Sequence, residues 1–140
     1  MIEETAASLE ATQLLMTIPD VSFYSSLLIT AELGKIERFD GADQAVSYAG
    51  LDPVVRESPD SRTEDGISKR GSGDLRWILV QCANTAVHRC NDPYLGRFCT
   101  RLKRRRNPQI GIVATARKLL VSIFYMLQRK EVYDPPGVSS

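Results

Sequence analysis

The chain has 140 residues, of which 43% are hydrophobic and 25% charged; this composition is typical of one globular domain and excludes a disordered or collagen-like chain. The net charge of +1 hides an uneven distribution, because residues 1–60 carry 3 basic and 11 acidic side chains, whereas residues 61–140 carry 15 and 6. This asymmetry predicts an acidic face and a basic face. A basic face suits either phosphates or the acidic face itself.

Cysteine and histidine are too sparse and too irregularly spaced to predict a disulfide framework or a metal site, since the chain has three cysteines without a C-x-x-C pair and one histidine. The acidic first residues differ from the basic start of a signal peptide, and the apolar run Leu119–Leu127 is too short to cross a bilayer. We therefore expect a cytoplasmic protein that binds neither metal nor membrane.

The first half of the chain predicts three helices separated by turn residues. The first covers Ile2–Met16, with Ala6, Leu9 and Leu14 loosely on one side. The second ends at Gly34, and its apolar stripe consists of Phe23, Leu27, Leu28 and Ala31. The third ends at Gly50, and its apolar positions are Ala42, Ala45, Val46 and Ala49.

Between 52 and 73 the helical pattern is interrupted by a cluster of Pro, Gly, Ser and Asp, which predicts one long central loop of the kind that often carries function. A strong helical stripe follows over Asp74–Cys90, formed by Leu75, Ile78, Leu79, Cys82 and Ala86. A helix starting at Asp92-Pro93 and a longer one after Asn107-Pro108 complete the domain. Apolar positions of the longest helix are Ile112, Ala116, Leu119, Leu120, Ile123, Phe124 and Leu127. The prediction is an all-α, compact multi-helix fold.

Basic residues gather at two places that could hold a nucleic-acid backbone. Six of the ten residues in 97–106 are Lys or Arg and none is acidic, which favours phosphate binding over a plain solvated helix end. The second place is the start of the Asp74–Cys90 helix, where the spacing alone favours a plain helix N-cap by Ser72 or Asp74 over an anion site. The residues predicted to hold backbone are Lys69, Arg70, Arg76, Arg101, Lys103, Arg104, Arg105 and Arg106.

Ser58 lies in the long loop between Arg56 and Arg62. By itself a loop serine followed by proline indicates a turn hydroxyl, because no general base is near in sequence. Two flanking arginines would stabilise a phosphoryl transition state better than an acyl one.

Several motifs in fixed order resemble the C-terminal domain of insertion-sequence transposases of the 110/116/902 family. They are Thr17–Val21, Ala31–Gly34, Arg38-Phe39, Ser47–Pro53, Gly66–Gly71 and Ala116–Leu120. The resemblance spans residues 17–134 and implies a helix-hairpin-helix-like start over Ile18–Gly34. It leaves residues 1–16 as an N-terminal helix, which could end a linker or coiled coil, and 135–140 as a tail.

The resemblance implies a nucleophilic role for Ser58, which attacks DNA and forms a phosphoserine link. Arg56 and Arg62, from their position beside Ser58, are the candidate charge stabilisers. It also implies a separate acidic domain that binds Mg²⁺, assembly into homo-oligomers, and in some members a structured guide RNA. This chain differs from the family pattern in having Asp20 and Ser22 in place of hairpin glycines, and Pro59 rather than glycine after the serine.

We therefore expect the DNA-binding domain of a transposase that acts in DNA transposition and recombination through serine-dependent strand transfer in the complete protein. The isolated chain, without the metal-binding domain, is expected to hold no cofactor and to be inactive. Two alternatives remain open at this point. One is a helical nucleic-acid-binding module in which Ser58 is inert, and the other is an oligomerisation module whose acidic and basic halves pair between subunits.

Overall fold

The computed structural model describes residues 2–52, 71–89, 94–95, 97–98 and 108–134. Within these ranges the regular structure is helical and contains no strand, which confirms the all-α prediction. The elements are α1 (Ile2–Leu15), α2 (Phe23–Leu33), the 3₁₀ turn η1 (Ile36–Arg38), α3 (Ala42–Tyr48), α5 (Gly73–Arg89) and α7 (Pro108–Arg129).

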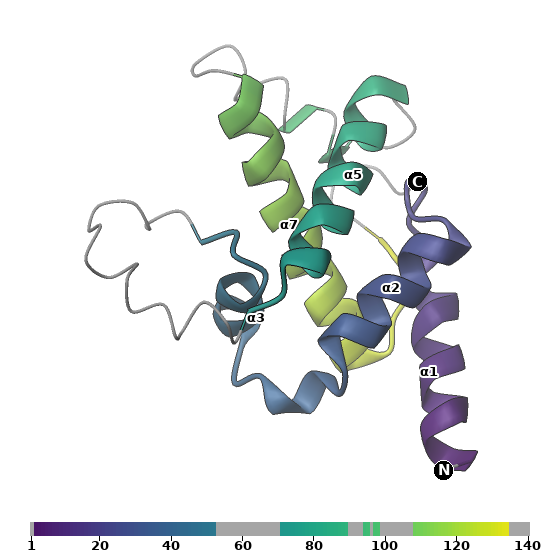
Figure 1. The fold of residues 1–140 in the computed structure, drawn as a ribbon. Coiled ribbons are helices and arrows are strands. Elements are labelled where there is room, and N and C mark those ends of the chain that lie inside the picture. Colours follow the sequence, from purple (N-terminus) through teal and green to yellow (C-terminus); the bar gives the residue numbers. More distant parts are fainter. Residues whose placement is uncertain (1, 53–70, 90–93, 96, 99–107, 135–140) are drawn as a thin grey trace, which may run out of the picture.

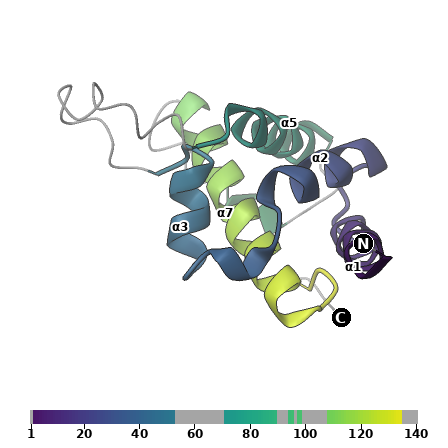
Figure 2. The ribbon, with the colours of Figure 1, turned by 60° about the horizontal axis from the view of Figure 1, so that its bottom comes forward.

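Helix α7 is the centre of the fold. It contacts α5, α3, α1 and η1, while α2 packs on α5 and α1, so that the shorter helices surround it in both views (Figures 1 and 2). Its inward residues are completely or almost completely buried, and they are Ala116, Leu119, Leu120, Ile123 and Phe124. Because the buried apolar positions recur at helical spacing from Ile112 to Met126, one face of α7 supplies much of the core.

The stripe predicted for α5 is confirmed, because Leu75, Ile78, Leu79, Cys82 and Ala86 are all buried. The short helix α3 is confirmed in the same way. It buries Ala42, Ala45, Val46 and Ala49.

The apolar stripe predicted for α2 is wrong, although the helix and its end at Gly34 are confirmed. Phe23 and Leu27 are exposed by 57% and 42%, and the buried residues are instead Ser25, Ser26, Ile29 and Leu33. Ser26 can be buried because its hydroxyl donates to the Phe23 carbonyl oxygen at 2.8 Å, which satisfies its polar group inside the helix. Two serines therefore share the buried face of α2 with Ile29 and Leu33, and Phe23 and Leu27 face outward.

The side predicted for α1 is also partly wrong, because Leu9 is 55% exposed and Leu14 is only half-buried. Thr12 and Leu15 supply the contact with the core instead. The Thr12 hydroxyl donates to the carbonyl oxygen of Ser8 at 2.9 Å, so a threonine is accommodated at a buried position.

Asp20 and Cys82 form a buried polar spot between the start of α2 and α5. Asp20 is 7% exposed, so its carboxylate faces the interior of the domain. It does not point outward from the turn between α1 and α2, where a phosphate backbone would lie in a helix-hairpin-helix. Burial raises the pKa of the Cys82 thiol to about 11, with a hydrogen bond from Ser25 lowering it and the charge of Asp20 raising it. A thiol in this state is protonated and chemically inert near neutral pH.

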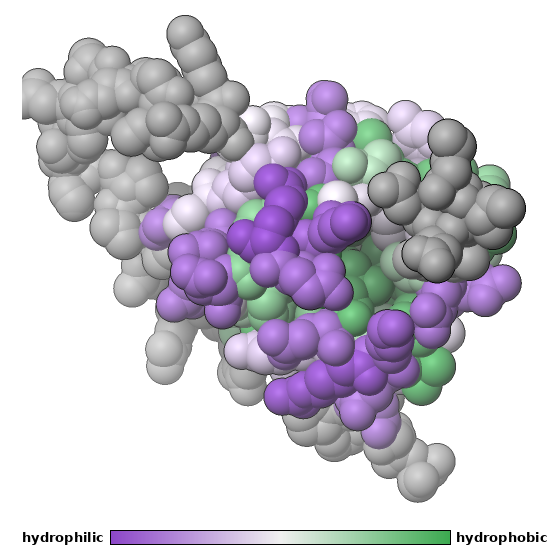
Figure 3. All heavy atoms as spheres, turned by 90° about the horizontal axis from the view of Figure 1, so that it is seen from below, coloured by the Kyte–Doolittle hydropathy of each residue, from purple (hydrophilic) through white to green (hydrophobic). Residues whose placement is uncertain are grey.

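One segment, Gly111–Arg129, is long and apolar enough to cross a membrane by length and composition. Half of it is buried among the other helices, as expected for the central helix of a folded domain, so the segment is weak evidence for a membrane span. The end of the fold where α7 finishes presents hydrophilic side chains around an apolar patch (Figure 3).

Candidate nucleic-acid interface

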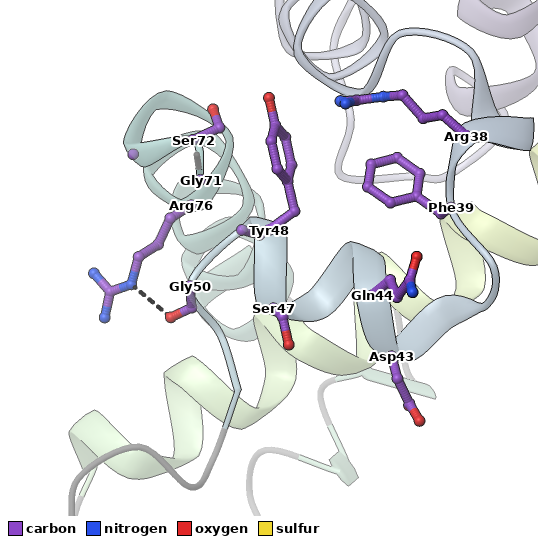
Figure 4. A pocket seen from close by; sticks show the side chains of 12 residues that line it. Arg38, Phe39, Asp43, Gln44, Ser47, Tyr48, Gly50, Gly71, Ser72 and Arg76 are labelled. Atoms are coloured by element: carbon purple, nitrogen blue, oxygen red, sulfur yellow. Dashed lines mark hydrogen bonds between the residues drawn. The ribbon is translucent and has the colours of Figure 1, made fainter. Parts of the chain in front are cut away.

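An open groove lies where η1, α3 and the start of α5 meet (Figure 4). Its volume is about 990 Å³, and its lining combines two arginines, two aromatic rings and several small residues. In the close-up, Arg76 lies at one end, Tyr48 stands in the middle, and Arg38 and Phe39 lie at the other end.

Ser72 fixes the floor of this groove by joining three elements. Its backbone N–H donates to the Tyr48 carbonyl oxygen at 2.8 Å, and its hydroxyl donates to Oε1 of Glu32 at 2.6 Å. The same hydroxyl oxygen accepts the backbone N–H of Leu75 at 3.0 Å, which makes Ser72 the N-cap of α5. The plain N-cap interpretation of this part of the sequence is confirmed, with Ser72 rather than Asp74 as the capping residue.

The turn after α3 contributes Gly50 to the groove lining, and the completely buried Leu51 follows it. Gly50 has a φ of +72°, a backbone conformation that glycine adopts more readily than other residues, and it turns the chain sharply after α3. The Gly50 carbonyl oxygen accepts a long hydrogen bond from Nε of Arg76 at 3.4 Å, and the Leu51 carbonyl oxygen accepts one from Nε of Arg117 at 3.0 Å. The backbone of this turn is thus tied to both α5 and α7.

Arg38 is held at its end of the groove by backbone and ring contacts. Its Nε donates to the Leu33 carbonyl oxygen at 2.8 Å and its Nη2 to that of Glu32 at 3.3 Å, so the cation satisfies the C-terminal carbonyls of α2. The guanidinium carbon lies 4.5 Å from the centre of the Phe39 ring and 4.7 Å from that of Tyr48. The two rings meet edge to face at 5.6 Å between centres.

Among the site residues predicted from the sequence, the structure places Arg76 in the groove. The others lie outside the described residues: Arg56, Ser58, Arg62, Lys69, Arg70, Arg101, Lys103, Arg104, Arg105 and Arg106. From the basic run, Arg97 is described and exposed. Phe98, beside it, lies 4.6 Å from Nζ of Lys118, measured to the ring centre.

The groove adjoins both ends of the segment that carries Ser58. Gly50 and Gly71 line it, and the Ser72–Tyr48 hydrogen bond holds the chain before and after residues 53–70 together (Figure 1). Sequence reasoning missed Arg38 and Tyr48 as groove residues. Both lie within the quoted motifs, but their spacing along the chain gives no sign that they meet.

No group of three or more His, Cys, Asp or Glu side chains that could hold a metal ion occurs within the described part of the chain.

Comparison with known proteins gives consistent matches. A family model described as Transposase IS116/IS110/IS902 family matches residues 12–100. The transposase for insertion sequence element IS1111A of Coxiella burnetii is 28% identical over 134 residues, which cover 94% of this chain and 37% of that protein. The transposase for insertion sequence element IS1328 of Yersinia enterocolitica is 34% identical over 80 residues, which cover 57% of this chain and 24% of that protein. The chain thus matches less than two fifths of the length of either relative.

Proposed function

Because this chain belongs to the IS116/IS110/IS902 family of transposases, we propose that it forms the C-terminal, DNA-binding part of such an enzyme and takes part in serine-dependent strand transfer. The observation that carries the proposal is the extent of the family match, since residues 12–100 include the whole lining of the groove as well as Ser58. The all-α fold and a groove with two arginines are compatible with this role.

In the proposed reaction, the Ser58 hydroxyl oxygen attacks the phosphorus of a DNA phosphodiester. A serine–phosphate bond forms, the bond from phosphorus to the leaving sugar oxygen breaks, and that oxygen takes up the proton that the serine hydroxyl loses. Attack by a sugar hydroxyl of another strand then breaks the serine–phosphate bond and joins the strands, and the proton of that sugar hydroxyl returns to the serine oxygen. Arg56 and Arg62 stabilise the negative charge on the transferring phosphoryl group.

By family resemblance, Mg²⁺ belongs to an acidic domain outside this chain, where it would polarise phosphoryl oxygens. We expect the isolated chain to bind DNA without recombining it.

The test of the catalytic role is a transposition assay with a full-length protein that carries this chain. Ser58→Ala should abolish both recombination and the covalent protein–DNA adduct, whereas Ser61→Ala, a matched loss of a hydroxyl three residues away, should leave both. Full activity of the Ser58→Ala protein would support the alternative of a nucleic-acid-binding module in which Ser58 is inert.

The test of DNA binding is a titration of the isolated chain with duplex DNA, single-stranded DNA and structured RNA at two salt concentrations. If about four of the basic side chains contact phosphates, log affinity for duplex DNA falls with log salt at a slope of about −0.9 for each contact. A preference for structured RNA would support a guide-RNA partner. The uneven charge also suits the alternative of an oligomer in which the acidic half of one subunit binds the basic half of another. Such an oligomer would dissociate at raised salt and would form without nucleic acid.

A further inference from the structure

The groove between α3 and α5 suits a nucleotide, and we propose that it holds one unpaired nucleotide of a DNA strand, with the phosphate on Arg76 and the nucleoside against Tyr48. This inference rests on the proposed function and adds to it a defined place for the strand. Neither residue belongs to the Ser58 segment, so the site can be tested separately from catalysis.

Arg76 has the geometry of a phosphate ligand. It is exposed, and its Nε donates a long hydrogen bond to the Gly50 carbonyl oxygen at 3.4 Å, which holds the guanidinium at one end of the groove. Its two terminal nitrogens have no hydrogen-bond partner within the described ranges, so both can donate to phosphate oxygens. The backbone of Gly73, which begins α5, lines the groove beside it, and a Cβ added there would meet open space within 4 Å.

Tyr48 and Arg38 suit the sugar and base. Arg38 donates hydrogen bonds from Nε and Nη2 to the last carbonyl oxygens of α2. Its positive charge is therefore held at the rim of the groove. Tyr48 is half-buried and stands between the two cations (Figure 4). Proteins that bind unpaired nucleic acid commonly place cations along the phosphate backbone and an aromatic ring beside them, on which a base stacks.

Size and charge agree with this occupant. Small-molecule sites commonly have volumes of about 300–1,000 Å³, and the open groove of about 990 Å³ lies at the upper end of that range. The acidic lining residue, Asp43, lies away from Arg76 in Figure 4, so it does not face the phosphate position. Arg76 supplies the positive charge at that position, while the carboxylates of Glu32 and Asp52 accept hydrogen bonds from the Ser72 and Ser47 hydroxyls.

Trp77 provides a built-in probe for the test. It is the sole tryptophan of the chain, it is 53% exposed, and it follows Arg76 directly. Its fluorescence can be followed while the whole chain is titrated with an oligodeoxythymidylate of about ten nucleotides, a length in the range that single-strand-binding domains cover.

Two groove variants and two controls form the experiment. Arg76→Ala removes the phosphate ligand, and Gly73→Glu adds a negative charge in space that the fold leaves open. Gln13→Glu on α1 and Arg129→Ala at the end of α7 make the same charge changes on exposed side chains that do not line the groove. Each variant is first checked by circular dichroism and thermal unfolding for an unchanged fold.

We expect both groove variants to lose about tenfold or more in affinity for the single strand, as for a lost hydrogen bond to a charged group. Arg76→Ala should also make the salt slope shallower by about 0.7, the value for one phosphate contact on a single strand. The controls should stay within about twofold of the wild-type chain, since they only change the distant field.

The outcomes separate the two proposals. If the wild-type chain binds neither DNA form, the proposed function fails. If it binds DNA and the groove variants bind as tightly as their controls, the function stands and the groove assignment is overturned. Stronger effects of the variants on structured RNA than on single-stranded DNA would overturn DNA as the occupant.

Discussion

Replacing Ser72 by alanine should destabilise the fold more than the loss of an ordinary helix cap. Ser72 is 8% exposed, and its hydroxyl both accepts the Leu75 N–H and donates to the Glu32 carboxylate. Ser72→Ala removes both bonds at once. It leaves the α5 amide and one oxygen of Glu32 without their partner.

The expected magnitude follows from these two losses. Removing an N-cap serine costs about 1 kcal/mol, and a hydrogen bond to a charged group contributes about 1.5–3 kcal/mol. Glu32 is half-buried, so water replaces part of the lost bond and the lower end applies. We expect a total loss of about 2–3 kcal/mol in the free energy of unfolding. For a chain of this size, that corresponds to a fall in Tm of about 5–10 °C.

The assay is urea unfolding followed by circular dichroism, with Ser22→Ala as the matched control. Ser22 caps α2 by accepting the Ser25 N–H at 3.2 Å, but it is exposed and contacts no carboxylate among the described residues, so its loss should cost about 1 kcal/mol or less. A double-mutant cycle with Glu32→Gln then isolates the serine–carboxylate coupling. If Ser72→Ala costs no more than Ser22→Ala, the reasoning about this junction is refuted.

Two further predictions concern the turn after α3 and the buried thiol. Gly50→Ala should cost about 1–2 kcal/mol in the free energy of unfolding, because the φ of Gly50 is +72°. The control is Gly73→Ala, where an added Cβ meets open space and thermal unfolding should not change measurably. Equal effects of the two variants would show that the turn conformation is not needed. The folded state holds the Cys82 proton more tightly than the unfolded chain, since its pKa rises from 9.0 to about 11. The contribution of the protonated thiol to the free energy of unfolding is therefore fully present below about pH 9. It falls by about 2–3 kcal/mol as the pH rises through about 11. Unfolding measured across that pH range should show the fall in the wild-type chain and a smaller one in Cys82→Ala, and parallel curves would contradict it.

Periodicity predicted the helices well where apolar residues alone decide which face is buried. The stripes of α5 and α7 contain enough Leu and Ile at helical spacing to leave one choice of face. In α2, the side chains of either face are small enough or apolar enough to be buried. Hydropathy favoured the face with Phe23 and Leu27 over the face with Ser25 and Ser26. The structure buries the serines because their hydroxyls find local partners, the Phe23 carbonyl oxygen for Ser26 and the Ser22 hydroxyl for Ser25, and because their small volume suits close packing.

The groove could not be predicted from the sequence, because its parts come from separate elements. Arg38 and Tyr48 approach Ser72 only through hydrogen bonds and ring contacts between η1, α3 and α5. The sequence did indicate a helix cap at the start of α5 and the end of the preceding helix at Gly50, and both are confirmed. The role of Arg76 as a backbone ligand stays a prediction, as do those of Ser58 and the basic run.

The central position of α7 has a consequence for the order in which the domain is made. The ribosome completes α5 some 40 residues before the last residue of α7, which takes roughly 2–8 s at ordinary rates of synthesis. During that interval the inner faces of α1, α3 and α5 lack the helix that covers them. The domain can therefore reach its native packing only after Phe124 has been added, and a chain interrupted before α7 would leave those apolar faces open to chaperones and proteases.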